Sequence, residues 1–228
     1  MSDPHIHHYV PQFYQRGFST TDDKNKIWVY EKGRKPRRCS IRSTGMELDL
    51  YAFTDHAGSS DFASVQKDLA KLDDLAAKII HRIEKREQLT SRDRTRLSRF
   101  ASVMWRRTSK HRAKVNRMAT DLLPQVLRPL ETLSNQLNDA ARSEIERIRR
   151  EYPINPPQFL FAQHVLRESD FEQVMYAMDW AFFEPPLGGE FLTSDDPVLF
   201  STGSGLGNKD AVKQRLHRGY QQRPQPYA

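Results

Sequence analysis

The sequence predicts an α+β fold that is mainly α, in which an N-terminal β-hairpin and short C-terminal strands flank a central bundle of long helices. Residues 27–30 are β-branched or aromatic, and the turn-rich segment 32–36 separates them from residues 37–42. That order is typical of a β-hairpin. Apolar residues then recur at intervals of three and four over residues 62–83, which is the period of an amphipathic helix.

The strands of the N-terminal part are predicted from composition and alternation. Residues 27–30 and 37–42 form the two arms of the hairpin, and residues 47–53 alternate between polar and apolar side chains. An alternation of period two is the pattern of a half-buried strand. We therefore expect residues 47–53 to add a third strand.

The central helices are predicted from periodicity, caps and prolines. Thr90 followed by Asp93 predicts the start of a second long helix, which Pro124 and Pro129 should kink or end. Residues 130–137, 145–148 and 159–167 continue the helical pattern. The first long helix is predicted over residues 61–86 from seven apolar residues at heptad spacing, namely Phe62, Val65, Leu69, Leu72, Ala76, Ile79 and Ile83.

The C-terminal part combines one more helix with short strands. Ser169 and Glu172 have the spacing of a capping box. Residues 180–183, 191–193 and 198–200 are predicted to be strands, because turn residues separate them. We expect residues 1–200 to form a single α+β domain and residues 201–228 to form a loosely ordered or truncated tail.

Charge is distributed unevenly along the 228 residues. The total is +7, yet residues 82–117 contain 13 Lys and Arg against 3 Asp and Glu, a net charge of +10. Residues 24–42 contain 8 against 1, a net charge of +7, which leaves −10 for the rest of the chain. Two basic segments on an acidic background indicate either a polyanionic partner or an internal acidic complement.

Composition also excludes several classes of protein. No apolar run approaches the roughly 20 residues that span a bilayer, so no membrane segment is expected. Cys39 is the only cysteine of the chain, which excludes an intramolecular disulfide. The N-terminus lacks the pattern of a secretory signal. We therefore expect a cytoplasmic protein.

Two sequence blocks resemble a bacterial family of unknown function, numbered 4238. Residues 7–18 read His-His-Tyr-Val-Pro-Gln-Phe-Tyr-x-Arg-x-Phe, and residues 191–198 read Phe-x-Thr-Ser-Asp-x-Pro-Val. A Trp-containing hairpin at residues 27–30 and an aromatic-Arg-Arg-Thr element at residues 105–108 add to the resemblance. It implies a bacterial, cytoplasmic protein and no known activity. The family usually continues with strand material after the second block, where this chain has a Gly-rich, basic tail.

The two blocks supply candidate catalytic and metal-ligating residues. His7, His8 and Asp195 are the candidate catalytic residues, and His8 with Asp195 are the candidate ligands of a divalent metal ion. Imidazole and carboxylate groups are common metal ligands. Two structural alternatives stay open. In the first, His8 would form a hydrogen bond with the backbone of a packed N-terminal segment. In the second, Asp195 would build a turn before Pro197.

The basic segment of residues 82–117 supplies candidate nucleic-acid contacts. Its cations include spacings of three, four and seven residues, which can form a stripe along a helix and neutralise phosphates without regard to base sequence. The alternative is that Arg106 or Arg107 forms a buried ion pair with Glu47, Asp195 or Asp196. The candidate contact residues are Arg92, Arg96, Arg99, Arg106, Arg107, Lys110 and Lys114.

Two functions are compatible with these features. The first is a metal-assisted phosphodiesterase or nuclease, with the polar centre at His7, His8 and Asp195 and the basic helix on the phosphate backbone. The second is a non-catalytic module that binds nucleic acid or an acidic protein, with the two blocks locking the fold. A third arrangement, in which the acidic remainder covers the basic helix, would leave no site for a polyanion.

Overall fold

The computed structural model describes residues 5–54, 60–61, 63–133, 136–151 and 158–199. Helices dominate these residues and short strands occupy the N-terminal part, so the predicted α+β, mainly α class is confirmed. The chain divides after Pro197 into two units. The tail predicted from residue 201 lies outside the described residues. No helix among the described residues is long and apolar enough to cross a membrane.

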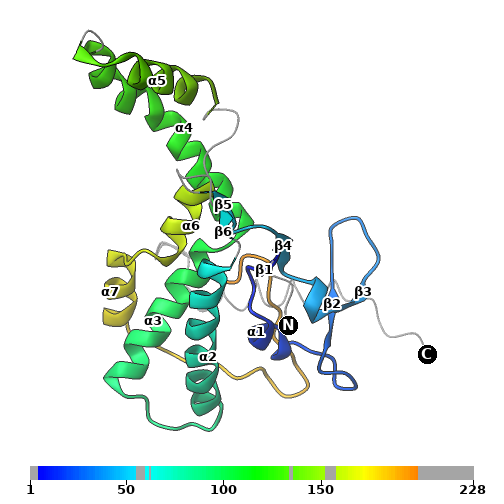
Figure 1. Cartoon of the computed structure of the whole chain (residues 1–228). Helices are drawn as coiled ribbons and strands as arrows, with labels where there is room; N and C mark the ends of the chain where they lie inside the picture. Colours follow the sequence, from blue (N-terminus) through cyan, green and yellow to red (C-terminus); the bar gives the residue numbers. More distant parts are fainter. Residues whose placement is uncertain (1–4, 55–59, 62, 134–135, 152–157, 200–228) are drawn as a thin grey trace. The chain divides into compact units, whose positions relative to one another are not determined.

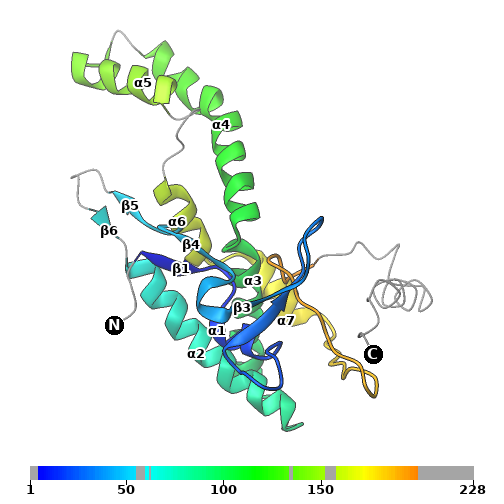
Figure 2. The same cartoon turned by 90° about the vertical axis from the view of Figure 1, so that its right-hand side faces the viewer.

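The N-terminal strands form separate two-stranded pairs (Figure 2). β2 (Lys26–Val29) pairs antiparallel with β3 (Arg37–Ser40), which confirms the predicted hairpin. The third strand forms only in part, as β4 (Met46–Leu48), and its partner is β1 (Ile6–His8) rather than the hairpin. A tight turn after β4 explains why the strand is short, because Asp49 adopts a φ of 54°.

Several short elements complete this part of the chain. The remaining strands are β5 (Phe53–Thr54) and β6 (Ser60–Asp61), which pair with each other. α1 (Gln12–Arg16) follows the first strand, and a 3-10 helix, η1 (Ile41–Ser43), follows the hairpin. These short elements contact one another, since α1 lies against η1 and β2. The predicted N-terminal block is therefore packed onto the base of the hairpin.

The two predicted long helices form, and the second starts where the sequence predicts. α2 (Ser64–Glu84) begins three residues later than predicted, because Asp61 belongs to a strand, and it buries five of the predicted a/d residues, including Leu69 and Ile79. α3 (Ser91–Arg106) begins with the predicted capping box, in which Thr90 and Asp93 bond each other's backbone N–H groups. α2 and α3 run side by side (Figure 1). Both helices therefore bury one face in a shared core, and that of α3 also carries Ser98, Ser102 and Arg106.

α4 (Ser109–Thr132) departs from the prediction. The chain turns after α3 at Arg107 and Thr108, and α4 then continues past Pro124 and Pro129 without ending at either. A proline costs a helix one backbone hydrogen bond. Leu127, between the two prolines, is buried, and we attribute the persistence of the helix to this tertiary packing, which overrides local propensity.

The last helices are α5 (Asp139–Glu151), α6 (Gln158–Leu166) and α7 (Asp170–Ala177). α6 is central, because Phe161 and Val165 are fully buried and the helix contacts α2, α3 and α4. α7 lies along α3. These contacts complete the core around α3.

Two C-terminal predictions are wrong. Ser169 occupies the N-cap position of α7 but makes no side-chain cap, because its hydroxyl lies 3.3 Å from that of Ser102 and the carboxylate of Glu172 pairs with arginines of α3. The strands predicted at 180–183, 191–193 and 198–200 do not form in any residue up to 199. Within that part of the chain no neighbouring strand offers backbone partners, and side chains such as Leu192 stay exposed.

Gly45 and Gly33 form a matched pair that tests the packing of the N-terminal block. Their φ angles are 63° and 80°. A Cβ on Gly45 would lie 2.8 Å from the Cβ of Val10, whereas nothing lies within 4 Å of one on Gly33. We expect Gly33→Ala to lower the free energy of unfolding by about 1–2 kcal/mol. Gly45→Ala should lose about 1–3 kcal/mol more through overpacking. Urea denaturation measures both losses, and equal losses would contradict the close packing.

Candidate functional site

His7 lies in β1, at the centre of the N-terminal block. It is fully buried, and its Nδ1 accepts a hydrogen bond from the backbone N–H of Tyr51 at 2.9 Å. The rings of His7 and Tyr51 stack with centroids 5.2 Å apart, and Tyr51 stacks in turn on Phe161 of α6. The Tyr51 hydroxyl donates to the carbonyl oxygen of Arg107 at 3.2 Å. His7 thereby joins β1 to the corner between α3 and α4.

His8 matches the structural alternative considered for it. Its Nε2 lies 3.2 Å from the carbonyl oxygen of Arg42, to which it donates a hydrogen bond. Burial of the ring lowers the pKa of His8, and the nearby Arg107 and Arg42 lower it further against the effect of backbone hydrogen bonds. Since Nε2 donates to a carbonyl, only Nδ1 retains a lone pair for a metal ion.

The Ser-Asp-Asp-Pro segment, residues 194–197, forms a turn that contacts α4, and the preceding Thr193 contacts Tyr14 of α1. The Ser194 hydroxyl donates to the carbonyl oxygen of Asp196 at 2.8 Å and lies 3.2 Å from its backbone nitrogen. The Asp196 carboxylate pairs with Lys110 of α4 at 2.6 Å. Asp195 is exposed, and burial raises the pKa of Tyr9, with smaller contributions from the charges of Asp195 and Glu47. The two sequence blocks therefore meet beside the start of α4.

This meeting point does not provide a complete set of metal ligands. Among the described residues, no three His, Cys, Asp or Glu side chains are grouped so that they could hold one metal ion. The nearby carboxylate of Glu47 already accepts a hydrogen bond from the Ser109 hydroxyl at 2.6 Å and pairs with Arg112. The predicted site of His8 and Asp195 thus lacks a third ligand within this part of the chain.

The predicted basic stripe is corrected at Arg106, which is only 2% exposed. Its guanidinium donates to the carbonyl oxygens of Ser102, His164 and Arg167 and pairs with Glu172 at 3.0 Å. Arg106 therefore ties α3 to α6 and α7. It cannot reach an external phosphate in this structure.

Arg107 is corrected for the same reason. It is fully buried, and its Nη1 donates to the Asp73 carboxylate of α2 at 3.0 and 3.2 Å, while its guanidinium lies 5.8 Å from the Phe100 ring centre. Burial raises the pKa of Asp73, and the charge of Arg107 opposes that rise. Arg106 and Arg107 thus form internal ion pairs, which is the alternative to phosphate binding. Their partners are Glu172 and Asp73, not Glu47, Asp195 or Asp196.

Of the other predicted contact residues, some form ion pairs with acidic side chains and others have no such partner in the described ranges. Arg99 pairs with Glu172 at 3.2 Å, and Lys110 pairs with Asp196 while keeping an exposed side chain. Lys114 lies 5.9 Å from the Trp105 ring centre. Arg92 and Arg96 have no hydrogen-bond or ion-pair partner within the described ranges. The stripe is therefore reduced to scattered cations on the helix surface.

The β2–β3 hairpin, by contrast, displays its charges. Lys26 and Trp28 share one face of β2, Tyr30 follows one residue after its end, and Trp28 and Tyr30 are 50% and 65% exposed. Lys26 pairs with Asp23 at 3.5 Å. Arg38 is the cross-strand partner of Trp28 and pairs with Asp22 at 2.8 Å. On the other face, Ile27 is buried. We call the face that carries Lys26, Trp28, Tyr30 and Arg38 the hairpin face.

Trp28 and Tyr30 are not among the predicted site residues. The signal that identifies them is the alternation itself, because residues two apart on a strand share a face. Once Ile27 is assigned to the core, Trp28 and Tyr30 fall on the opposite side of the alternating segment, and both are expected to point to solvent. Three exposed lysines of the same segment have no hydrogen-bond or ion-pair partner in the described part of the chain, namely Lys24, Lys32 and Lys35.

A histidine pair lies beside the other candidate residues. His111 of α4 and His164 of α6 place their Nε2 atoms 3.0 Å apart, with ring planes 12° apart and centroids 5.1 Å apart. The rings meet edge to edge, so one Nε2–H donates to the lone pair of the other. Burial, followed by His164 and the nearby cations, lowers the pKa of His111 to about 4. Burial and Arg106 lower that of His164.

Comparison with known proteins gives a family and no function. The model of a family described as "Protein of unknown function (DUF4238)" matches residues 6–217. No curated protein and no solved structure matches the chain.

The histidine pair predicts a loss of stability in mild acid. Because the folded-state pKa values lie below the usual 6.5, the unfolded chain binds more protons and stability falls as pH drops from about 6.5 towards about 4. We expect His111→Gln to flatten the pH dependence of the free energy of unfolding over this range. His81→Gln, at an exposed position of α2, is the control. A parent-like slope in the His111 variant would refute this assignment.

The Arg107–Asp73 pair predicts a large loss on truncation. Arg107→Met leaves the half-buried carboxylate of Asp73, which is 21% exposed, without its partner, and we expect the free energy of unfolding to fall by about 1–3 kcal/mol. Arg96→Met removes the same charge from α3 where the side chain is unpaired in the described structure, and should change stability by less than about 0.5 kcal/mol. Urea denaturation of both variants decides the matter, and similar losses would show that Arg107 has no special structural role.

Proposed function

The chain belongs to the DUF4238 family, and we propose that this member is a nucleic-acid-binding module whose binding surface is the hairpin face. The observation that carries the proposal is the exposure of Trp28 in β2 and of Tyr30 just beyond it, within a strongly basic segment. Aromatic rings flanked by cations are the combination that binds single-stranded nucleic acid.

Charge supplies the first part of the binding energy. Residues 24–42 carry a net charge of +7. Within this segment Glu31 is the only acid, and it is shared by Arg34 and Arg37. The lysines of the turn therefore have no local carboxylate to neutralise them. Phosphate groups can take that place and release condensed counterions, which makes the binding independent of base sequence and sensitive to salt.

The aromatic side chains supply the second part and select single strands. Trp28 lies in β2 and Tyr30 is two residues further along the chain, so each exposed ring can receive one unstacked base. Each stacked base contributes about 1–3 kcal/mol and requires no particular sequence. In a duplex the base faces are already stacked. We therefore expect preference for a single strand over a duplex of the same charge density.

The metal-assisted nuclease hypothesis has weaker support. His8 uses its Nε2 on the Arg42 carbonyl oxygen and His7 uses its Nδ1 on the backbone of Tyr51. The phosphate contacts assigned to Arg106 and Arg107 are replaced by internal ion pairs. Two arginines that were predicted to contact the substrate, Arg106 and Arg107, thus stabilise the fold instead. The hairpin, in contrast, keeps cations and aromatic rings exposed.

Fluorescence anisotropy with a labelled 12-nucleotide oligothymidine strand tests the proposal. The parent protein should bind the strand, with affinity that falls steeply as salt rises. Trp28→Ala and Tyr30→Ala should each weaken binding by roughly tenfold. Lys32→Gln together with Lys35→Gln should reduce the slope of affinity against salt by about two.

The controls separate this surface from others. Phe183→Ala removes an aromatic side chain that is 80% exposed elsewhere on the chain, and it should leave the affinity unchanged. Failure of the parent to bind would overturn the proposal, as would binding that is indifferent to the hairpin variants. Mg²⁺-dependent cleavage of the strand would favour the nuclease instead.

A further inference from the structure

α4 carries apolar side chains on two adjacent faces. One face is covered by the chain itself, because Leu127 is buried and α4 contacts α3, α5 and α6. The second face is a ridge of large apolar side chains at intervals of four residues, each of which is 39–63% exposed. We call this face the α4 ridge, and its members are Met118, Leu122, Val126 and Leu130. Contiguous exposed apolar side chains mark an interaction surface.

We propose that the α4 ridge is the interface of a homodimer, in which the α4 helices of two copies pack in antiparallel orientation. The proposal is independent of nucleic-acid binding by the hairpin face. Side chains four residues apart form the ridges by which packed helices interlock. α4 and α5 lie side by side (Figures 1 and 2), so each copy supplies two helices. A second copy therefore completes a four-helix bundle, in which every helix buries an apolar face.

The α4 ridge matches its own copy. In a two-fold symmetric interface, residue i of one subunit meets residue j of the other, and j meets i. The ridge is about 18 Å long, and its middle lies at residue 124. An antiparallel pair centred there sets Met118 against the partner's Leu130 and Leu122 against the partner's Val126. Each side chain of the ridge then meets an apolar side chain.

Two charges of α4 favour this antiparallel pairing. Asp121 and Arg128 are exposed two turns apart on one side of the helix, and their side chains have no hydrogen-bond or ion-pair partner in the described part of the chain. Their midpoint falls half a residue from the middle of the ridge, so the antiparallel pair brings Asp121 level with the partner's Arg128. A parallel pair would set each charge level with its own copy. An anionic membrane attracts a ridge bordered by cations, and Asp121 opposes that attraction.

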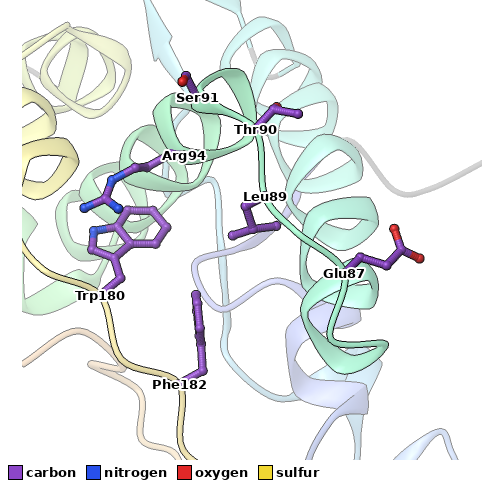
Figure 3. A pocket seen from close by; sticks show the side chains of 7 residues that line it. All are labelled: Glu87, Leu89, Thr90, Ser91, Arg94, Trp180 and Phe182. Atoms are coloured by element: carbon purple, nitrogen blue, oxygen red, sulfur yellow. The ribbon is translucent and has the colours of Figure 1, made fainter.

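The other exposed apolar side chains show no such match. The pocket in Figure 3, of about 440 Å³, lies between Leu89 in the α2–α3 connection and Trp180 and Phe182 after α7. Its apolar walls come from two separate segments, and Arg94 already covers the indole, 4.6 Å from the ring centre. Phe182 is 57% exposed and lies outside the helices. It therefore serves as the control position for the α4 ridge.

Sedimentation velocity of the full chain, without nucleic acid, tests the dimer. One helix of each copy makes the contact, so the interface is small, and we expect a dissociation constant in the micromolar range. Leu122→Glu places a charge at the centre of the ridge in both copies and should weaken the dimer by about 100-fold or more. Phe182→Glu should leave the dissociation constant unchanged. A parent protein that stays monomeric at every concentration would overturn the proposal, as would a dimer that Leu122→Glu does not weaken.

Disulfide trapping tests the antiparallel orientation in a Cys39→Ser background. Met118→Cys and Leu130→Cys are made in separate chains, which are then mixed and oxidised. The antiparallel pair brings these two positions together, so the mixed disulfide should form in preference to a disulfide between two copies of either variant. Two copies of Met118→Cys that crosslink equally well when alone would refute this orientation. Monomeric protein that cosediments with phosphatidylserine vesicles through the ridge would assign the ridge to a membrane instead, and would also overturn the dimer.

Discussion

The buried guanidinium of Arg107 is the group around which the rest of the structure is arranged. It reaches from the end of α3 to Asp73 on α2, and the carbonyl oxygen of the same residue accepts the hydroxyl of Tyr51. Tyr51 in turn holds His7 by stacking and by a backbone hydrogen bond. One residue thus links both long helices to the N-terminal strands. A buried ion pair adds little net stability, yet it is costly to break, so it specifies where these elements meet.

This constraint decides which basic residues can serve a ligand. Arg106 pairs with Glu172 and Arg107 pairs with Asp73, while Arg99 also pairs with Glu172. Two acids, Glu172 and Asp73, are therefore paired within the helical core. The β2–β3 hairpin also forms ion pairs, but at its surface, where Lys26, Arg34, Arg37 and Arg38 pair with Asp23, Glu31 and Asp22. Lys24, Lys32 and Lys35 stay exposed in the same segment, near its exposed aromatic rings.

What the sequence predicts well is local, and what it misses depends on partners distant in the chain. The heptad spacing and the Thr90 cap act within a few residues, and both helices form, α3 at the predicted start and α2 three residues after it. Glu172 fails as a capping residue because two arginines of α3 compete for it. α4 continues past Pro124, which local sequence rules do not predict. The burial of Arg107 depends on Asp73, 34 residues away, which no spacing rule reveals. The exposure of Trp28, by contrast, was available from strand alternation once the core face was known.

Photocrosslinking of a short DNA strand carrying 5-iodouracil, followed by mass spectrometry of the peptides, tests the central claim most directly. The claim is that polyanion binding lies on the hairpin and not on the basic helices. The account predicts crosslinks to the peptide that contains Trp28 and Tyr30, lost when unlabelled strand competes. Crosslinks confined to peptides of α3 and α4, with none in residues 24–42, would contradict it.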